Sequence, residues 1–74
     1  MNIDVLIPLL KDGWVAMDEN GWWNWFSHKP SLRIRRSKWV IVSFRTDFCP
    51  LGAFDIAHAE DWTQSLIKIE RKDK

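Results

Sequence analysis

The sharpest cluster of chemically useful side chains is the basic run Arg33-Ile34-Arg35-Arg36-Ser37-Lys38-Trp39. Arginine and lysine contact phosphate groups, and a nearby indole ring stacks on an unpaired base. The candidate nucleic-acid contacts are Arg33, Arg35, Arg36 and Lys38, with Trp23 or Trp25 as the stacking ring. The same charges would also serve as a solvated loop that keeps an edge strand soluble. Because the whole chain has a net charge of only +1, weak binding of single-stranded nucleic acid is the alternative function and not the favoured one.

The chain offers few of the groups that enzymes and metal sites use. His28 and His58 stand far apart in the sequence, and Cys49 is the only thiol. A zinc site needs further ligands, and Cys49-Pro50 belongs to no recognisable nucleophile turn. The three glycines are isolated, so the sequence has no glycine-rich phosphate loop. We therefore expect no enzyme, with no catalytic residues, no metal, no cofactor and no small-molecule substrate.

Size and composition restrict the architecture. A chain of 74 residues makes one small domain, expected over residues 1–69 and followed by a disordered charged tail over residues 70–74. The lone cysteine excludes an intramolecular disulfide. No apolar run approaches the length of about 18 residues that suggests a membrane span. No basic segment precedes the N-terminal apolar run, as one would in a signal peptide, so the expected location is cytoplasmic.

The centre of the predicted fold is a hairpin over residues 14–26, where two apolar runs flank Asn20-Gly21. Asparagine and glycine tolerate the positive φ angles that a two-residue type I′ loop requires. The cross-strand pairs expected from this loop are Glu19 with Trp22, Met17 with Asn24, and Val15 with Phe26. Side chains alternate between the faces of a sheet, so this register puts Ala16 and three indoles on the other face.

Those three indoles, Trp14, Trp23 and Trp25, are the candidate protein-binding residues. Neither face of the hairpin is polar, although a half-exposed antiparallel sheet usually alternates apolar and polar side chains. Three arrangements are open. The flanking segments cover both faces, or one face binds a protein partner or a second copy of the chain, or that face is a ligand platform.

The flanking segments predict helices and further strands. Residues 2–12 have helical spacing of apolar side chains, Asn2 as N-cap and Gly13 as a stop, and Pro8 either delays or kinks this helix. The best single strand covers residues 38–44, and we expect it in the middle of the sheet.

Weaker patterns complete the chain. We expect a short edge strand near residues 32–35, a loop over residues 47–52 and a last strand over residues 53–56. Residues 57–69 favour a helix that starts near Ala59, with a strand over residues 66–69 as the alternative. The predicted class is α+β, with a small antiparallel sheet of three to four strands built on the hairpin, a short N-terminal helix and a short C-terminal helix.

Four short segments form a further pattern: Gly13-Trp14-Val15-Ala16, Lys29-Pro30, Phe54-Asp55-Ile56 and Asp61-Trp62-Thr63-Gln64-Ser65-Leu66. With these motifs the chain resembles small, uncharacterised, tryptophan-rich proteins encoded by bacterial phages and prophages. The centre of the chain departs from that group, because Arg33, Arg35 and Arg36 stand where an acidic segment is expected. The resemblance implies no activity. It favours a mobile-element origin and a partner from the phage or its host. Together with the aromatic sheet face, the sequence predicts a small non-enzymatic interaction module of phage or prophage type, which binds a protein partner or itself through that face.

Overall fold

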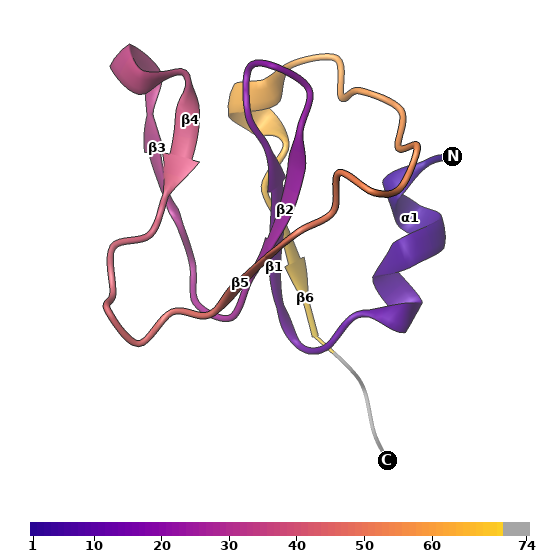
Figure 1. Cartoon of the computed structure of the whole chain (residues 1–74), viewed down its shortest axis with the longest axis horizontal. Helices are drawn as coiled ribbons and strands as arrows, with labels where there is room; N and C mark the ends of the chain where they lie inside the picture. Colours follow the sequence, from indigo (N-terminus) through magenta and orange to yellow (C-terminus); the bar gives the residue numbers. More distant parts are fainter. Residues whose placement is uncertain (71–74) are drawn as a thin grey trace.

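The computed structural model describes residues 1–70, and the rest of the expected tail lies outside the described residues. The strands are β1 (Gly13–Met17), β2 (Trp23–Phe26), β3 (Ser31–Arg33), β4 (Lys38–Val40), β5 (Phe48–Pro50) and β6 (Ile67–Ile69). Four of them form an antiparallel sheet in the order β5-β2-β1-β6, and β3 and β4 form a separate antiparallel pair (Figure 1). The predicted α+β class with antiparallel pairing is confirmed.

The N-terminal helix is shorter than the sequence predicted. Helix α1 (Ile3–Leu6) continues as a 3₁₀ turn over Ile7–Leu9, and Asn2 caps it by accepting a hydrogen bond from the Asp4 N–H at 2.9 Å. Pro8 has no N–H to donate to the carbonyl four residues back, so the α-helical ladder cannot continue past it. The helix therefore ends well before Gly13, which is the first residue of β1.

The hairpin β1–β2 is confirmed, but its predicted register is wrong by one residue. The observed pairs are Trp14 with Phe26, Val15 with Trp25, Ala16 with Asn24, and Met17 with Trp23. The Gly21 N–H donates to the Asp18 carbonyl at 2.9 Å, and the Asp18 N–H donates to the Trp22 carbonyl at 3.0 Å. Gly21 has a φ of 89°. This is the three-residue hairpin loop, in which a tight turn is followed by a left-handed glycine.

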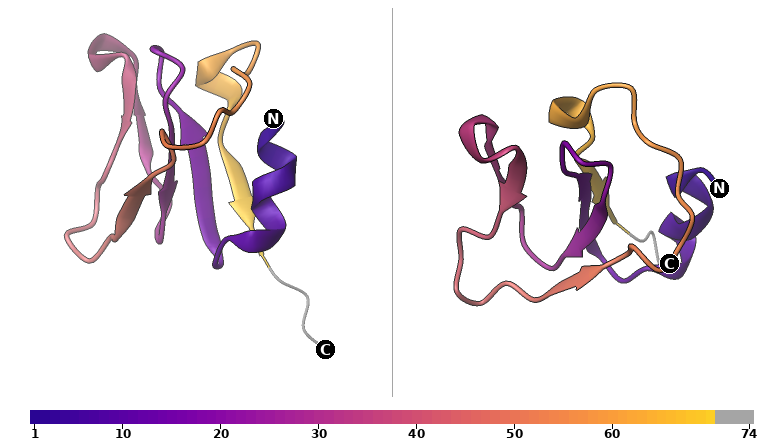
Figure 2. Two further views of the ribbon diagram at one scale, coloured as in Figure 1. Left: turned by 45° about the vertical axis from the view of Figure 1, so that its right-hand side comes forward. Right: turned by 45° about the horizontal axis from the view of Figure 1, so that its top comes forward.

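Each face of the four-stranded sheet is covered by other parts of the chain. On one face, α1 and the segment 51–59 enclose a core of eight buried side chains: Ile3, Leu6, Val15, Met17, Trp23, Leu51, Ile56 and Ile69. The β3–β4 hairpin covers the other face, where Ala16, Phe26 and Trp39 form a smaller core. Figure 2 shows the β3–β4 pair as a layer apart from the main sheet, with α1 at the opposite side.

Two of the predicted strands are wrong. β4 contains only the first residues of the predicted strand 38–44, and it pairs with β3 and not with the hairpin. The pairing stops at Val40 opposite Ser31, which follows Pro30, and the next residues, Ile41 and Val42, are exposed. Residues 53–56 form no strand. The main sheet instead gains β5, which lies within residues 47–52, where the sequence predicted a loop. Pro50 is tolerated there because β5 is an edge strand.

The predicted C-terminal helix is also wrong, whereas the strand predicted as its alternative is confirmed. Only a 3₁₀ turn over Trp62–Gln64 forms, capped by the Asp61 side chain, which accepts from the Thr63 N–H at 3.0 Å. β6 then pairs with β1, so the first and last strands of the described chain are neighbours. In residues 1–70, none of the helices has the length and apolar character that crossing a membrane requires.

Candidate interaction surface

The structure separates the three indoles that the sequence placed together. Trp23 is buried in the larger core, and its indole N–H donates to the Ala57 carbonyl at 3.2 Å. Trp25 packs against the same core, and its N–H donates to the Lys11 carbonyl at 3.0 Å. Trp14 packs against the smaller core on the other face, because the one-residue shift in register moves it there. The fold therefore brings Trp23 and Trp25 together and places Trp14 apart from them.

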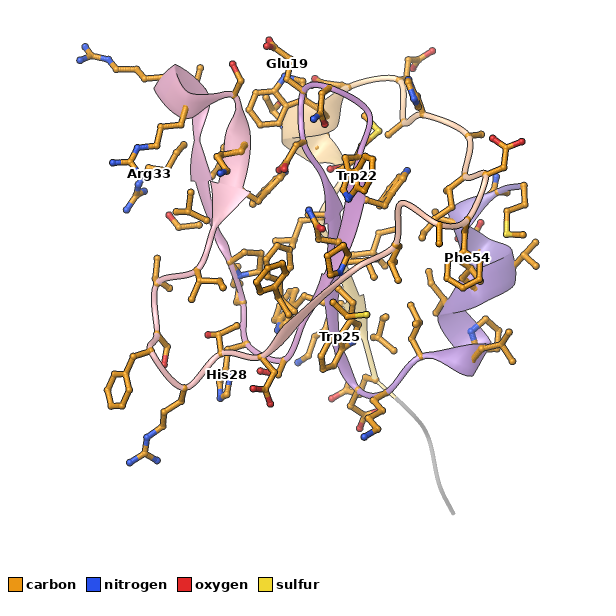
Figure 3. The ribbon with its side chains drawn as sticks, viewed as in Figure 1. Glu19, Trp22, Trp25, His28, Arg33 and Phe54 are labelled. Atoms are coloured by element: carbon orange, nitrogen blue, oxygen red, sulfur yellow. The ribbon has the colours of Figure 1, made fainter. Side chains whose placement is uncertain are left out.

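The four candidate nucleic-acid contacts stay together on the β3–β4 hairpin. Arg33 and Lys38 are cross-strand partners, and Arg35 and Arg36 lie in the 3₁₀ turn that joins the two strands. All four are exposed. Ser37 closes the turn with a φ of 58°, and its N–H donates to the Ile34 carbonyl at 3.0 Å. The basic run therefore lies on a hydrogen-bonded turn at the tip of a hairpin. Figure 3 shows Arg33 pointing away from the main sheet.

We define residues 29–45 as the basic lobe. Its six cations are Lys29, Arg33, Arg35, Arg36, Lys38 and Arg45, and it contains no carboxylate. Within residues 1–70, none of these cations forms an ion pair, since the one ion pair there joins Lys68 to Glu70. The positive potential of the basic lobe is therefore open to a partner.

The basic lobe also exposes apolar side chains, which the sequence analysis did not single out. They are Ile34, Ile41, Val42 and Phe44, and the Phe44 side chain is 94% exposed. The cation of Arg45 lies 5.9 Å from the centre of the Phe44 ring. Part of this apolar surface lines an open groove of about 900 Å³ together with Arg33, Arg35 and Arg36. The sequence already contained the information that could have identified this surface, because apolar residues lie among basic ones in a stretch without acidic residues.

The basic lobe is attached to the hairpin loop by two hydrogen bonds. The Trp39 N–H donates to Asp18 Oδ1 at 2.8 Å, and the Glu19 N–H donates to the Ser37 carbonyl at 3.1 Å. Burial raises the pKa of the Asp18 carboxyl above its ordinary 3.8, although the bond from Trp39 and the charge of Lys38 oppose this. Folding therefore partly removes the Asp18 carboxylate from water, and the same carboxylate holds β4 through its hydrogen bond from the Trp39 N–H.

Replacing Asp18 by alanine is expected to lower the free energy of unfolding by about 1–2 kcal/mol, because the Trp39 N–H loses its acceptor. Asp18→Asn keeps that acceptor and removes the partly buried charge, so its free energy of unfolding should match or exceed that of the wild type at neutral pH.

The raised pKa of Asp18 also predicts a pH dependence. A carboxyl whose pKa is raised in the folded state favours folding most at low pH, and this contribution is lost as the pH rises through the pKa of the folded state. Urea unfolding across the acidic range checks both points. Equal losses in the two variants would contradict the role of the hydrogen bond.

The groups that might do covalent or metal chemistry are scattered. Cys49 is exposed on the edge strand β5, and the Nδ1 atom of His28 lies 3.0 Å from the neighbouring Ser27 hydroxyl. Over residues 1–70, no cluster of three or more histidine, cysteine or acidic side chains is arranged to hold a metal ion. Comparison of the chain with protein-family models, with curated proteins and with solved structures gives no match.

Proposed function

We propose that this chain is a small, non-enzymatic protein-interaction module, and that its basic lobe binds an acidic protein segment that carries apolar side chains. The observation that carries the proposal is the composition of the basic lobe: six cations, no carboxylate and four exposed large hydrophobic side chains. Protein interfaces combine apolar anchors with complementary charges in this way. The resemblance to phage and prophage proteins stays a prediction.

The folding of the chain supports the basic lobe over the aromatic sheet face as the binding surface. Trp23 is 3% exposed, and both Trp23 and Trp25 have indole N–H groups already bonded to backbone carbonyls. A partner that reached Trp23 would first have to displace α1 or the segment 51–59, which cover it. The apolar side chains of the basic lobe are exposed without any such rearrangement.

Single-stranded nucleic acid is supported less well than an acidic protein. The exposed cations suit phosphates. The stacking rings expected beside them, Trp23 and Trp25, instead pack into the core on the far face of the main sheet. Phe44 is the one aromatic ring exposed on the basic lobe, and stacking platforms use several.

A labelled short peptide in which glutamate alternates with leucine and phenylalanine tests the proposal by fluorescence anisotropy. We expect Arg33→Ser, Arg35→Ser, Arg36→Ser and Lys38→Ser, combined in one variant, to weaken binding by about 10–100-fold. Exposed ion pairs contribute about 0.2–1 kcal/mol each, and four of them are removed. The salt dependence of binding should fall with the affinity.

A pair of aromatic-to-serine variants tests the apolar part of the surface. Phe44→Ser in the basic lobe should weaken peptide binding several-fold, whereas Trp22→Ser, which also removes an exposed aromatic ring but lies outside the lobe, should leave it unchanged. A glutamine version of the peptide and an oligothymidine strand are the control ligands. Tighter binding of the oligothymidine than of the acidic peptide would replace the proposal with the nucleic-acid function.

A further inference from the structure

The exposed apolar side chains gather at two opposite ends of the molecule. Ten large hydrophobic side chains are exposed in residues 1–70, and four of them belong to the basic lobe. Four others belong to α1, its flanks and the segment 51–61: Met1, Val5, Leu9 and Phe54. The backbone extends 41 Å along its longest axis, which lies horizontally in Figure 1, with the basic lobe at the left and α1 at the right. Figure 3 shows Arg33 and Phe54 at these two ends.

The end opposite the basic lobe has the opposite charge. Its exposed carboxylates include Asp4 on α1, with Asp55 and Glu60 on the segment 51–61, whose backbone is hydrogen-bonded to Met1. Residues 47–61 carry four acids and no lysine or arginine. We define α1 with its flanking residues 1–9 and the segment 51–61 as the acidic end. Each end therefore combines exposed apolar side chains with charged side chains of one sign, and the two signs are opposite, although the N-terminal ammonium of Met1 also lies at the acidic end, where it donates to the Asp55 carbonyl.

We propose that the acidic partner of the basic lobe is the acidic end of a second copy of this chain, so that copies associate head to tail. The inference rests on the proposed function, because it uses the same basic lobe. A symmetric contact between two basic lobes would bring six cations against six, and the repulsion disfavours it. A contact between different ends leaves one free basic lobe and one free acidic end on every pair. Such a contact continues into a longer assembly unless its rotation closes a ring.

The expected association is weak and depends on salt. Each end is a small face, since the backbone measures 30 × 20 Å across the long axis. Interfaces below the standard size belong to transient complexes, so we expect a dissociation constant on the order of 10–100 µM. Because exposed charges supply part of the attraction, higher ionic strength should weaken it.

Sedimentation of two complementary variants tests the head-to-tail arrangement. The first variant disables the basic lobe with Arg33→Ser, Arg35→Ser, Arg36→Ser and Phe44→Ser. The second disables the acidic end with Asp4→Asn, Asp55→Asn, Glu60→Gln and Leu9→Ser. All eight positions are exposed, and a circular dichroism spectrum equal to that of the wild type shows that each variant is folded. Where a quadruple variant is not folded, Phe44→Ser alone and Leu9→Ser alone replace the pair.

We expect the wild type to form dimers and larger species as its concentration rises, and each variant alone to remain a monomer. An equal mixture of the two variants should form dimers and stop there, because only one intact basic lobe and one intact acidic end are available per pair. A wild type that stays monomeric up to about ten times the expected dissociation constant would overturn the inference. So would a mixture that stays monomeric, or a disabled variant that still dimerises. If the basic lobe then still binds the acidic peptide, the proposed function stands and only the second copy as partner is excluded.

Discussion

Replacement of Trp23 by alanine is expected to destabilise the protein by about 3–5 kcal/mol. The Trp23 side chain is 3% exposed and lies in the larger core, beneath α1 and the segment 51–59. Its removal leaves a cavity between the sheet and the segment that covers it. It also leaves the Ala57 carbonyl without the indole N–H that donates to it at 3.2 Å. In a domain of this size, such a loss is a large part of the total stability.

Urea unfolding followed by circular dichroism measures this effect, and the neighbouring Trp22 provides a matched control. The Trp22 side chain is 48% exposed, so Trp22→Ala should cost about 1 kcal/mol or less. Equal losses from the two substitutions would show that the face of the sheet with Trp23 is not the main core.

Replacement of Gly13 by alanine is expected to cost about 2–4 kcal/mol, since it combines backbone strain with overpacking. Gly13 has a φ of 156°, which side-chain-bearing residues rarely adopt. An added Cβ would overlap the Phe26 carbonyl oxygen and would lie 2.9 Å from the indole nitrogen of Trp25. The carbonyl belongs to the paired strand β2, so it cannot move without disturbing the hairpin.

Gly52 is the control for this second substitution. The three atoms nearest to a Cβ on Gly52 all belong to the Trp22 indole, a half-exposed side chain that can turn away. Gly52→Ala should therefore cost clearly less than Gly13→Ala in the same unfolding assay. A smaller loss at Gly13 than at Gly52 would contradict the close approach of β1 to β2 at this point.

The hairpin shows how far the sequence determines the fold. Asn20-Gly21 predicted the position of the turn correctly but not its length, because a glycine with positive φ serves both the two-residue and the three-residue loop. Register is normally decided by which face must be buried. Here both faces are apolar and both are covered, so the hydrophobic pattern did not distinguish two registers that differ by one residue.

The favoured predictions for residues 38–44 and 57–69 were wrong because pairing with other strands decided the structure of both segments. Strand propensity marked residues 38–44, but the length of β4 is limited by its three-residue partner β3. The helical spacing of Trp62, Leu66 and Ile69 competed with the strand over residues 66–69. Pairing with β1 decided the outcome, since it places Ile69 opposite Gly13 and buries its side chain.

The candidate surface was predictable in its charges and not in its apolar side chains. Arg33, Arg35, Arg36 and Lys38 are polar in any environment, and the structure leaves them exposed together. The sequence placed residues 38–44 in the middle of the sheet, because both faces of the predicted strand are apolar. Trp39 is buried, yet Phe44 is almost fully exposed. Of the three candidate indoles, Trp23 is buried in the larger core and Trp25 packs against it, which agrees with the first of the three arrangements that the sequence left open.

The most direct measurement of the central claim is a ¹⁵N-resolved NMR titration of the wild type with the acidic glutamate, leucine and phenylalanine peptide, at a protein concentration where the chain is monomeric. We expect shifts to concentrate in residues 31–45, including the amides of the exposed Ile34, Val42 and Phe44. The amides of α1 and of the segment 51–61 should stay in place. Shifts centred on α1 or on β1 and β2, or no shifts at millimolar peptide, would contradict the assignment of the basic lobe as the interaction surface.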